Sequence, residues 1–120
     1  MKVSELGENG LIALIAGLIS HSQDKSRLSW QQLITGIGDD TAVWRNEACI
    51  QLATVDSLRQ NEHFYPGMMS WADLGWKALA INLSDIAAMG GTPTYALVSL
   101  ALPDSTEVDD VTDLYRSMID

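Results

Sequence analysis

Apolar residues recur with helical spacing in three parts of this chain. From Ser4 to Ser20 they follow a first turn that carries acidic side chains, which the positive end of the helix dipole favours. Residues 74–91, LGWKALAINLSDIAAMGG, are apolar nearly all round, and this pattern is typical of a buried helix. Ser70 is expected to cap that helix, and Gly90 with its following glycine is expected to end it. From residue 105 on, hydroxyl and acidic residues predict the start of a last helix.

Shorter runs with a period of two residues predict strands. Residues 41–45 follow a turn of glycines and aspartates at 36–40, and we expect them to form a hairpin with residues 48–55. Residues 95–102, YALVSLAL, are apolar on both faces, as in a buried central strand. The order helix, strand, strand, helix, strand, helix predicts an α+β fold, in which a mostly antiparallel sheet carries its helices on one face.

The composition narrows the class of protein. The 120 residues suit one domain, and 47% hydrophobic residues can supply a core. A net charge of −9 disfavours binding to nucleic acid or to an anionic membrane. The single Cys49 excludes an internal disulfide, and its apolar surroundings indicate a buried thiol rather than a nucleophile. We see no signal peptide and no apolar run of membrane-spanning length, and therefore expect a cytoplasmic protein. Because the chain stops inside a predicted helix, we expect it to be part of a longer protein.

Four carboxylates stand where carboxylates are unusual. Asp39 and Asp40 follow a Gly-x-Gly turn, Asp56 ends a predicted strand on the same face as Thr54, and Asp85 interrupts the predicted buried helix. Clustered carboxylates repel one another unless a cation lies between them. Carboxylate oxygens suit Mg²⁺, which proteins hold with a few carboxylates and the phosphates of a substrate. If these residues converge, they predict a Mg²⁺–nucleotide site for phosphoryl transfer.

Each of these signals also has a plainer explanation. Asp85 could lie on a narrow solvated stripe or pair with one Lys or Arg. His21 fits a solvated helix end, and His63 could pack against the aromatic residues that follow it. The four tryptophans fit a core or an interface better than a platform for stacking bases. The two common nucleotide-binding signatures are absent, so the spacing alone indicates only a possible metal–phosphate site.

Four motifs nevertheless occur together and in order: GIGDDTAV, TVDSL with a His-Phe pair seven residues after its Asp, LGWKALAINLSDIAAMGGTP, and LALP. From about Ser4 to its end the chain resembles the thiamine-monophosphate kinase family, within the ATP-binding aminoimidazole ribonucleotide synthetase superfamily. The resemblance implies transfer of the γ-phosphoryl group of ATP to thiamine monophosphate, which gives thiamine diphosphate.

The resemblance also implies roles for individual residues. It assigns the following: Mg²⁺ ligands Asp40, Thr54, Asp56 and Asp85; cofactor contacts Asp39 and Val55; and a substrate contact, His63. It implies a four-stranded sheet with helices outside, two copies of which pair into an eight-stranded barrel. The expected partners are therefore ATP, thiamine monophosphate and a second copy of the chain, without nucleic acid or membrane.

The chain departs from the family pattern in one loop. Gln60, Asn61 and Glu62 stand where the family usually has Glu-Gly before the His-Phe pair. A Gly-Gly-Asp segment and the family's C-terminal domain would lie beyond residue 120, so we expect residues 1–120 to be a single N-terminal domain that is inactive alone. Two alternatives stay open. One is another ATP-using member of the superfamily, of the selenophosphate synthetase, hydrogenase-maturation or purine-synthesis type, and the other is a non-catalytic dimerisation module.

Overall fold

The computed structural model describes residues 1–46, 50–60 and 67–119. The chain divides into two compact units. The first comprises Met1–Gln51 and Thr94–Val108, and the second comprises Leu52–Pro93 and Asp109–Asp120.

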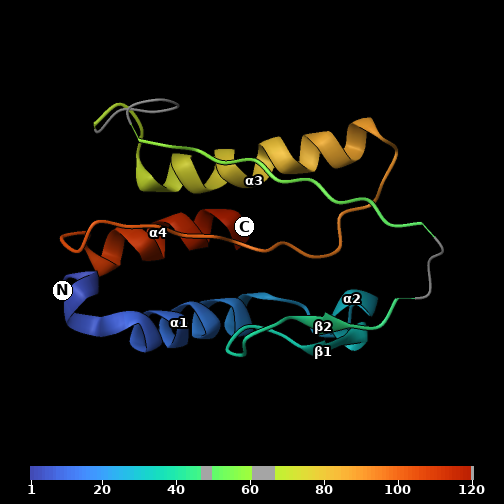
Figure 1. Cartoon of the computed structure of the whole chain (residues 1–120), viewed down its shortest axis with the longest axis horizontal. Coiled ribbons are helices and arrows are strands. Elements are labelled where there is room, and N and C mark those ends of the chain that lie inside the picture. The colour runs from blue at the N-terminus through green and yellow to red at the C-terminus, as the bar shows by residue number, and fades with distance from the viewer. Residues whose placement is uncertain (47–49, 61–66, 120) are drawn as a thin grey trace. The chain divides into compact units, whose positions relative to one another are not determined.

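The first unit begins with the long helix α1, Val3–Ser22 (Figure 1), which confirms the helix predicted from Ser4 to Ser20. Oε2 of Glu5 accepts the backbone N–H of Lys2 at 2.6 Å and so satisfies one of the donors that a helix start leaves free. Gly7 departs from helical geometry with a φ of 77°, which kinks the helix after its first turn. Val3 and Ile15 are its buried residues.

Helix α1 is also the one helix in the described part of the chain that is long and apolar enough to cross a bilayer. Its only charged residues of the Asp, Glu, Lys or Arg type are Glu5 and Glu8. The prediction that no apolar run reaches membrane-spanning length is therefore wrong for α1. Core helices of soluble proteins and signal sequences pass the same test, so length and composition alone do not assign α1 to a membrane.

The first unit also contains a short helix and a small hairpin. Helix α2, Leu28–Gln32, leads directly into strand β1, Leu33–Thr35, which pairs antiparallel with strand β2, Val43–Trp44. Strand β2 lies within the strand predicted at 41–45. The predicted pairing of that strand with residues 48–55 is wrong for residues 50–55, the part of that range that the structure describes. The turn of glycines and aspartates joins β2 to the strand before it, because such a turn reverses the chain between its two flanking segments.

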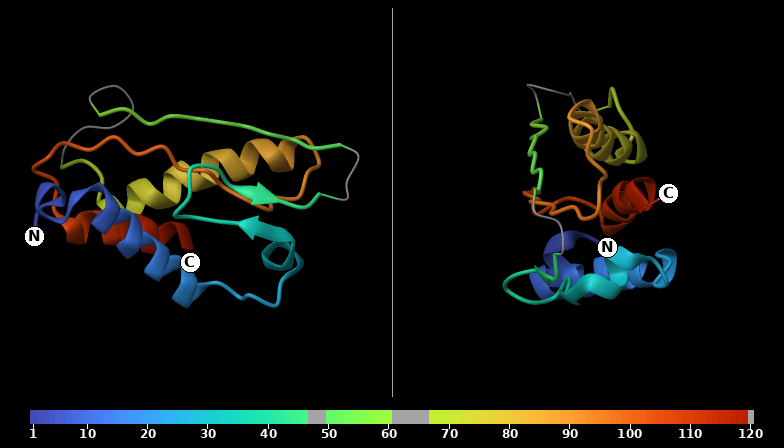
Figure 2. Two further views of the ribbon diagram at one scale, coloured as in Figure 1. Left: turned by 60° about the horizontal axis from the view of Figure 1, so that its bottom comes forward. Right: turned by 90° about the vertical axis from the view of Figure 1, so that its right-hand side faces the viewer.

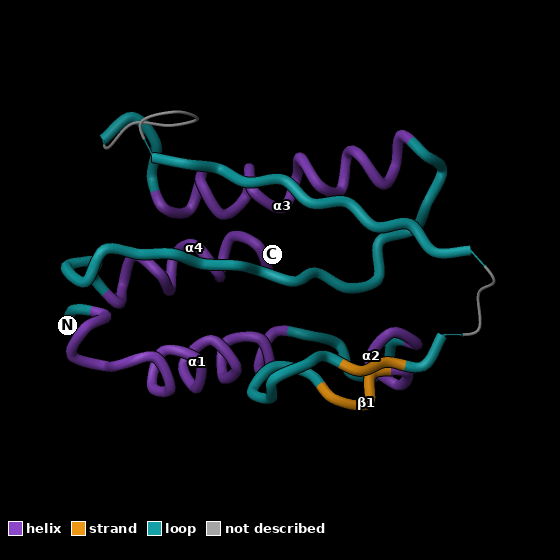
Figure 3. The backbone as a smooth tube through the Cα atoms, in the orientation of Figure 1, coloured by secondary structure: helices purple, strands orange, loops and turns teal. Residues whose placement is uncertain are grey.

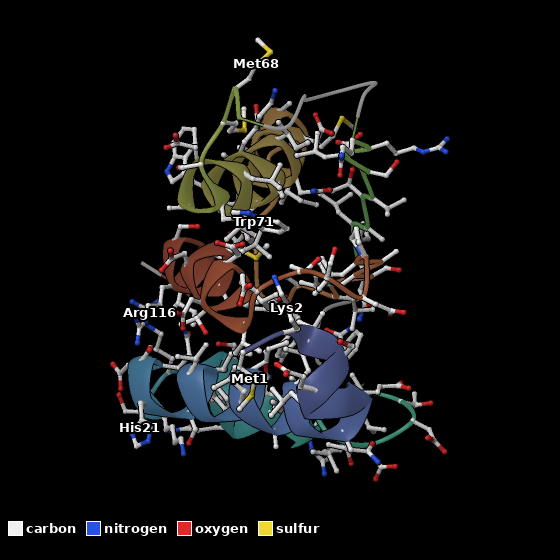
Figure 4. The ribbon with its side chains drawn as sticks, turned by 90° about the vertical axis from the view of Figure 1, so that its left-hand side faces the viewer. Met1, Lys2, His21, Met68, Trp71 and Arg116 are labelled. Carbon is white, nitrogen blue, oxygen red and sulfur yellow. The ribbon has the colours of Figure 1, made fainter. Side chains whose placement is uncertain are left out.

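The start of the chain is bound to the loop that precedes the last helix. The N–H of Val3 donates to the carbonyl of Thr106 at 2.8 Å, and the N–H of Val108 donates to the carbonyl of Met1 at 2.8 Å. The Met1 amine lies 3.3 Å from Oε2 of Glu107. Figure 4 labels Met1 at this end of the chain. Backbone groups that would otherwise lack partners at both helix starts are thus satisfied by each other.

The second unit is built on helix α3, Trp71–Ala88. The N–H of Asp73 donates to Oγ of Ser70 at 3.0 Å, which confirms Ser70 as the predicted cap. Met68, two residues before that cap, points away from the helix into solvent (Figure 4).

Two glycines end α3, as predicted. Gly90 has a φ of 74°, a conformation that costs glycine little. Its N–H donates to the carbonyl of Ala87 at 3.0 Å, and the N–H of Gly91 donates to the carbonyl of Ile86 at 3.0 Å. This pair of hydrogen bonds is the Schellman arrangement, which satisfies carbonyls at the end of a helix.

Helix α4, Val108–Ile119, confirms the last predicted helix. Within the second unit it provides three buried residues: Val111, Leu114 and Tyr115. Gly75 is the buried residue of α3 and lies directly against α4, since a Cβ built there would collide with the carbonyl oxygen of Leu114. The absence of a side chain at this one position lets the two helices approach closely.

The prediction that α3 is buried nearly all round is wrong in this structure. Trp76 is 66% exposed, and Met89 is also largely exposed. Apolar side chains that were expected to be buried are therefore exposed on α3. Apolar surface of this kind marks places where another surface packs.

The predicted four-stranded sheet is seen only in part. In the part of the chain that the structure describes, the sheet has the two strands β1 and β2. Residues 50–60 and 94–102 follow long, irregular courses instead (Figure 3). Strand pairing needs a neighbouring strand with the right register, and a period-two pattern does not say where that neighbour comes from.

Candidate functional site

The loop between β1 and β2, residues 36–42, carries the first two candidate residues. Its Gly38 has a φ of 110°, which a residue with a side chain adopts only with strain. Oδ1 of Asp39 accepts the backbone N–H of Asp40 at 2.8 Å. This bond fixes the Asp39 carboxylate inside the turn, and both carboxylates are exposed. Asp40 is therefore the freer of the two to bind a ligand.

The second unit holds three candidates in the segment that begins at Leu52. Thr54, Val55 and Asp56 are all exposed, with Val55 at 89%. Leu52 packs at the end of α3, since a Cβ on Gly91 would lie 2.6 Å from its Cδ1. From there the segment runs along α3 in the opposite direction (Figures 1 and 2).

Asp85 lies in the last part of α3 and is exposed. The segment with Thr54 and Asp56 and the helix with Asp85 both belong to the second unit, and their antiparallel courses lie side by side (Figures 1 and 2).

Asn82, one turn before Asp85, has a feature that the sequence did not reveal. Its Nδ2 donates to the carbonyl of Ala78 at 2.9 Å, while its buried Oδ1 has no hydrogen-bond partner. A buried acceptor without a partner costs about 1–3 kcal/mol. The only signal in the sequence was the presence of a polar residue within an apolar helix.

The candidate residues do not form a closed cluster in the structure. Among residues 1–46, 50–60 and 67–119, no group of three or more His, Cys, Asp or Glu side chains could hold a metal ion. Asp39 and Asp40 belong to the first unit and the remaining described candidates to the second, so their convergence on one cation stays a prediction. His63 and Cys49 lie outside the described residues.

Comparison with known proteins gives a consistent set of relatives. The family model described as AIR synthase related protein, N-terminal domain, matches residues 38–120. Thiamine-monophosphate kinase of Bacillus subtilis is 38% identical over 99 residues, which cover 82% of this chain and 30% of the relative. The enzyme of the same name from Aquifex aeolicus is 39% identical over 115 residues, 96% of this chain and 33% of the relative. That of Escherichia coli K12 is 43% identical over 91 residues, 75% of this chain and 28% of the relative.

The chain thus spans about a third of the length of these curated relatives. No solved structure matches it.

Proposed function

This chain belongs to the AIR synthase related family, whose N-terminal domain it matches, and we propose that it is the Mg²⁺- and nucleotide-binding part of a thiamine-monophosphate kinase. The reaction would transfer the γ-phosphoryl group of ATP to thiamine monophosphate. The observation that carries the proposal is the similarity to the relatives of that name, at 38% and 39% identity over most of this chain. Because the chain spans about a third of their length, the complete site is expected to need the remaining parts of such an enzyme as well.

The candidate side chains have the chemistry that Mg²⁺ requires. Asp40, Asp56 and Asp85 supply carboxylate oxygens, and Thr54 supplies a hydroxyl, which are hard ligands that suit this ion. All four residues are exposed and so can be reached by a hydrated ion and by phosphates. Bound Mg²⁺ would neutralise charge on the phosphates of ATP. The carboxylates would hold the ion, while Asp39 shapes the loop that presents Asp40.

The remaining assignments rest on the family resemblance. Val55, next to two of the proposed ligands, would contact the nucleotide, and His63 would contact thiamine monophosphate. Cytoplasmic localisation fits these two small water-soluble substrates.

We further propose that two copies of the chain pair through a sheet completed between them. Large apolar side chains are exposed in residues 50–60 and 94–102, and they are Ile50, Leu52, Val55, Leu97, Val98 and Leu100. Exposed apolar residues gathered on a few segments mark a surface that another protein surface covers. A homodimer would cover them.

One feature of the sequence favours a second candidate function. Gln60, Asn61 and Glu62 replace the usual Glu-Gly pair in the loop before His63. If this loop selects the substrate, another acceptor of the γ-phosphoryl group is possible on the same metal site. Measuring ATP turnover against a panel of phosphate, selenide and carboxylate acceptors distinguishes the two functions.

The test of the proposed function uses the chain extended to the length of its relatives. We expect ATP- and Mg²⁺-dependent formation of thiamine diphosphate, measured by chromatography. Asp56→Asn and Asp85→Asn should each reduce the rate by about a hundredfold or more, as loss of one electrostatic group at a phosphoryl-transfer site does. Asp104→Asn, which changes an exposed aspartate outside the candidate site, should have little effect.

Two results would contradict the proposal. Full activity in both Asp56→Asn and Asp85→Asn would show that these two aspartates are not Mg²⁺ ligands. Turnover of ATP with another acceptor, and none with thiamine monophosphate, would replace the substrate and leave the metal site in place.

A further inference from the structure

Tyr95 links two elements that flank the loop of Asp39 and Asp40. Its hydroxyl donates to the backbone carbonyl of Ser29 in α2 at 2.7 Å, across 66 positions of sequence. Its ring contacts Trp44 of β2, with ring centroids 5.0 Å apart and the planes tilted by 36°. All three residues belong to the first unit. Tyr95 therefore ties the helix before β1 to the strand after the loop.

The hairpin that Tyr95 contacts has little support of its own. Its register joins Leu33 to Trp44 and Thr35 to Val43, and it is irregular between those two positions. One more backbone bond, from the N–H of Arg45 to the carbonyl of Gln32 at 2.8 Å, extends it. An isolated two-stranded hairpin is marginally stable in water. A contact from outside the hairpin therefore has a large share in fixing its geometry.

The loop at the other end of the hairpin depends on that geometry. Residues 36–42 have Gly38 in a left-handed conformation and an internal bond between Asp39 and Asp40, and residues 37–41 of this loop are exposed or partly exposed. The loop therefore takes its position from the two strands that it joins. If β1 and β2 shift against each other, the Asp40 carboxylate shifts with them.

We propose that Tyr95 is a positioning residue, which holds β2 against α2 and thereby fixes the loop of residues 36–42 for cation binding by Asp40. The inference rests on the proposed function, because Asp40 is a metal ligand only in that proposal. Tyr95 touches no reacting atom, and its role passes through the hairpin. In the sequence Tyr95 stands in an apolar run, and no local pattern indicates this role.

The test compares Tyr95→Phe with Tyr115→Phe in the 120-residue chain. The first variant keeps the ring on Trp44 and removes only the hydroxyl that binds Ser29. The second removes a hydroxyl from a buried tyrosine of α4, in the other unit, and controls for the loss of a tyrosine hydroxyl in general. Trp44→Leu removes the ring contact and keeps an apolar strand residue. Circular dichroism first establishes a temperature at which all the proteins are folded.

Two readouts are then taken by NMR. The first is the shift of the backbone amides of residues 36–41 as Mg²⁺ is added. The second is the rate of hydrogen exchange, without Mg²⁺, of the Arg45 amide, whose N–H donates to the carbonyl of Gln32 in the hairpin. We expect Tyr95→Phe and Trp44→Leu to weaken Mg²⁺ binding at the loop about two- to tenfold, the range that one lost contact of this kind gives. We also expect faster exchange at Arg45. Tyr115→Phe should change neither quantity at these residues.

The outcomes separate this inference from the proposed function. If the unsubstituted chain binds Mg²⁺ at the loop and Tyr95→Phe binds it equally well, the positioning role is wrong and the metal role of Asp40 stands. If the unsubstituted chain shows no Mg²⁺ binding at the loop, Asp40 does not hold the ion without the remaining parts of the enzyme. Hydrogen exchange then still decides the positioning role. Faster exchange in Tyr95→Phe than in Tyr115→Phe supports that role, and equal rates overturn it.

Discussion

At the scale of single residues, Glu107 pairs with two cations at once. Its carboxylate binds the ammonium group of Lys2 and the α-amino group of Met1. The hydrogen bond from Lys2 is the main reason that the pKa of Glu107 lies below its ordinary value of 4.5, and the α-amino group adds to the effect. The Glu107 side chain is partly exposed, at 43%, so the contribution of this surface ion pair to stability is expected to be small. Its pH dependence is nevertheless a clear signature.

The sign of this dependence follows from the lowered pKa. A carboxyl group whose pKa is lower in the folded state stabilises the fold above its unfolded pKa, and this contribution is lost as the pH falls through the folded pKa. We expect Glu107→Gln to reduce the free energy of unfolding at pH 7 and to have no effect at a pH well below 4.5. Urea unfolding at both pH values measures this change in the free energy of unfolding. Glu8→Gln, which changes an exposed carboxylate of α1 outside this ion pair, is the control. An equal difference for Glu107→Gln at both pH values would contradict the ion pair.

At the scale of elements, helices α3 and α4 contact each other closely at Gly75. A Cβ there would meet the carbonyl oxygen of Leu114 and Oγ of Ser117. The carbonyl is part of the α4 backbone and cannot turn aside, so α3 and α4 would have to separate. Gly17 in α1 offers the opposite case, since a Cβ there would meet nothing within 4 Å.

These two glycines give a matched pair of substitutions. Gly75→Ala should lower the free energy of unfolding by about 1–3 kcal/mol, the usual cost of an overpacked contact. Gly17→Ala should raise it by about 0.5–1 kcal/mol, because alanine favours a helix over glycine. Chemical denaturation of the two variants measures both values. If Gly75→Ala proved as stable as Gly17→Ala, the described approach of α3 to α4 would be wrong.

The same scale shows what the sequence could predict. Helices α1, α3 and α4 were predicted because helical periodicity, the Ser70 cap and the Gly90 stop are local signals. The pairing of β2 was not, because pairing depends on residues distant in sequence. Of the candidate site, the turn at Asp39 and Asp40 was predictable from its own residues. The link from Tyr95 to Ser29 spans 66 positions and leaves no local pattern.

At the scale of the whole molecule, the apolar composition exceeds what the structure buries. Five hydrophobic residues are buried among the described residues, and they are Val3, Ile15, Val111, Leu114 and Tyr115. Leu97 is 82% exposed although it lies in the run that predicts a buried strand. Burial of such residues is expected to come from a second copy of the chain.

Self-association is therefore expected and can be measured directly. Sedimentation equilibrium should show a species of twice 13.1 kDa that dissociates on dilution. Leu97→Gln should weaken it, because it places a polar amide in the proposed interface. Leu28→Gln is the control, since Leu28 is an exposed leucine of α2 and lies outside residues 50–60 and 94–102. A chain of 13.1 kDa at every concentration would contradict the proposed dimer.

The proposed metal centre requires that Asp40 of the first unit share a cation site with Asp56 and Asp85 of the second. Crystals of the chain extended to the length of its relatives, grown with Mn²⁺ and ATP, test this most directly. We predict anomalous density for Mn²⁺ in contact with the carboxylates of all three aspartates and with the phosphates of ATP. Anomalous density beside the ATP phosphates that touches none of these aspartates would contradict the proposed centre.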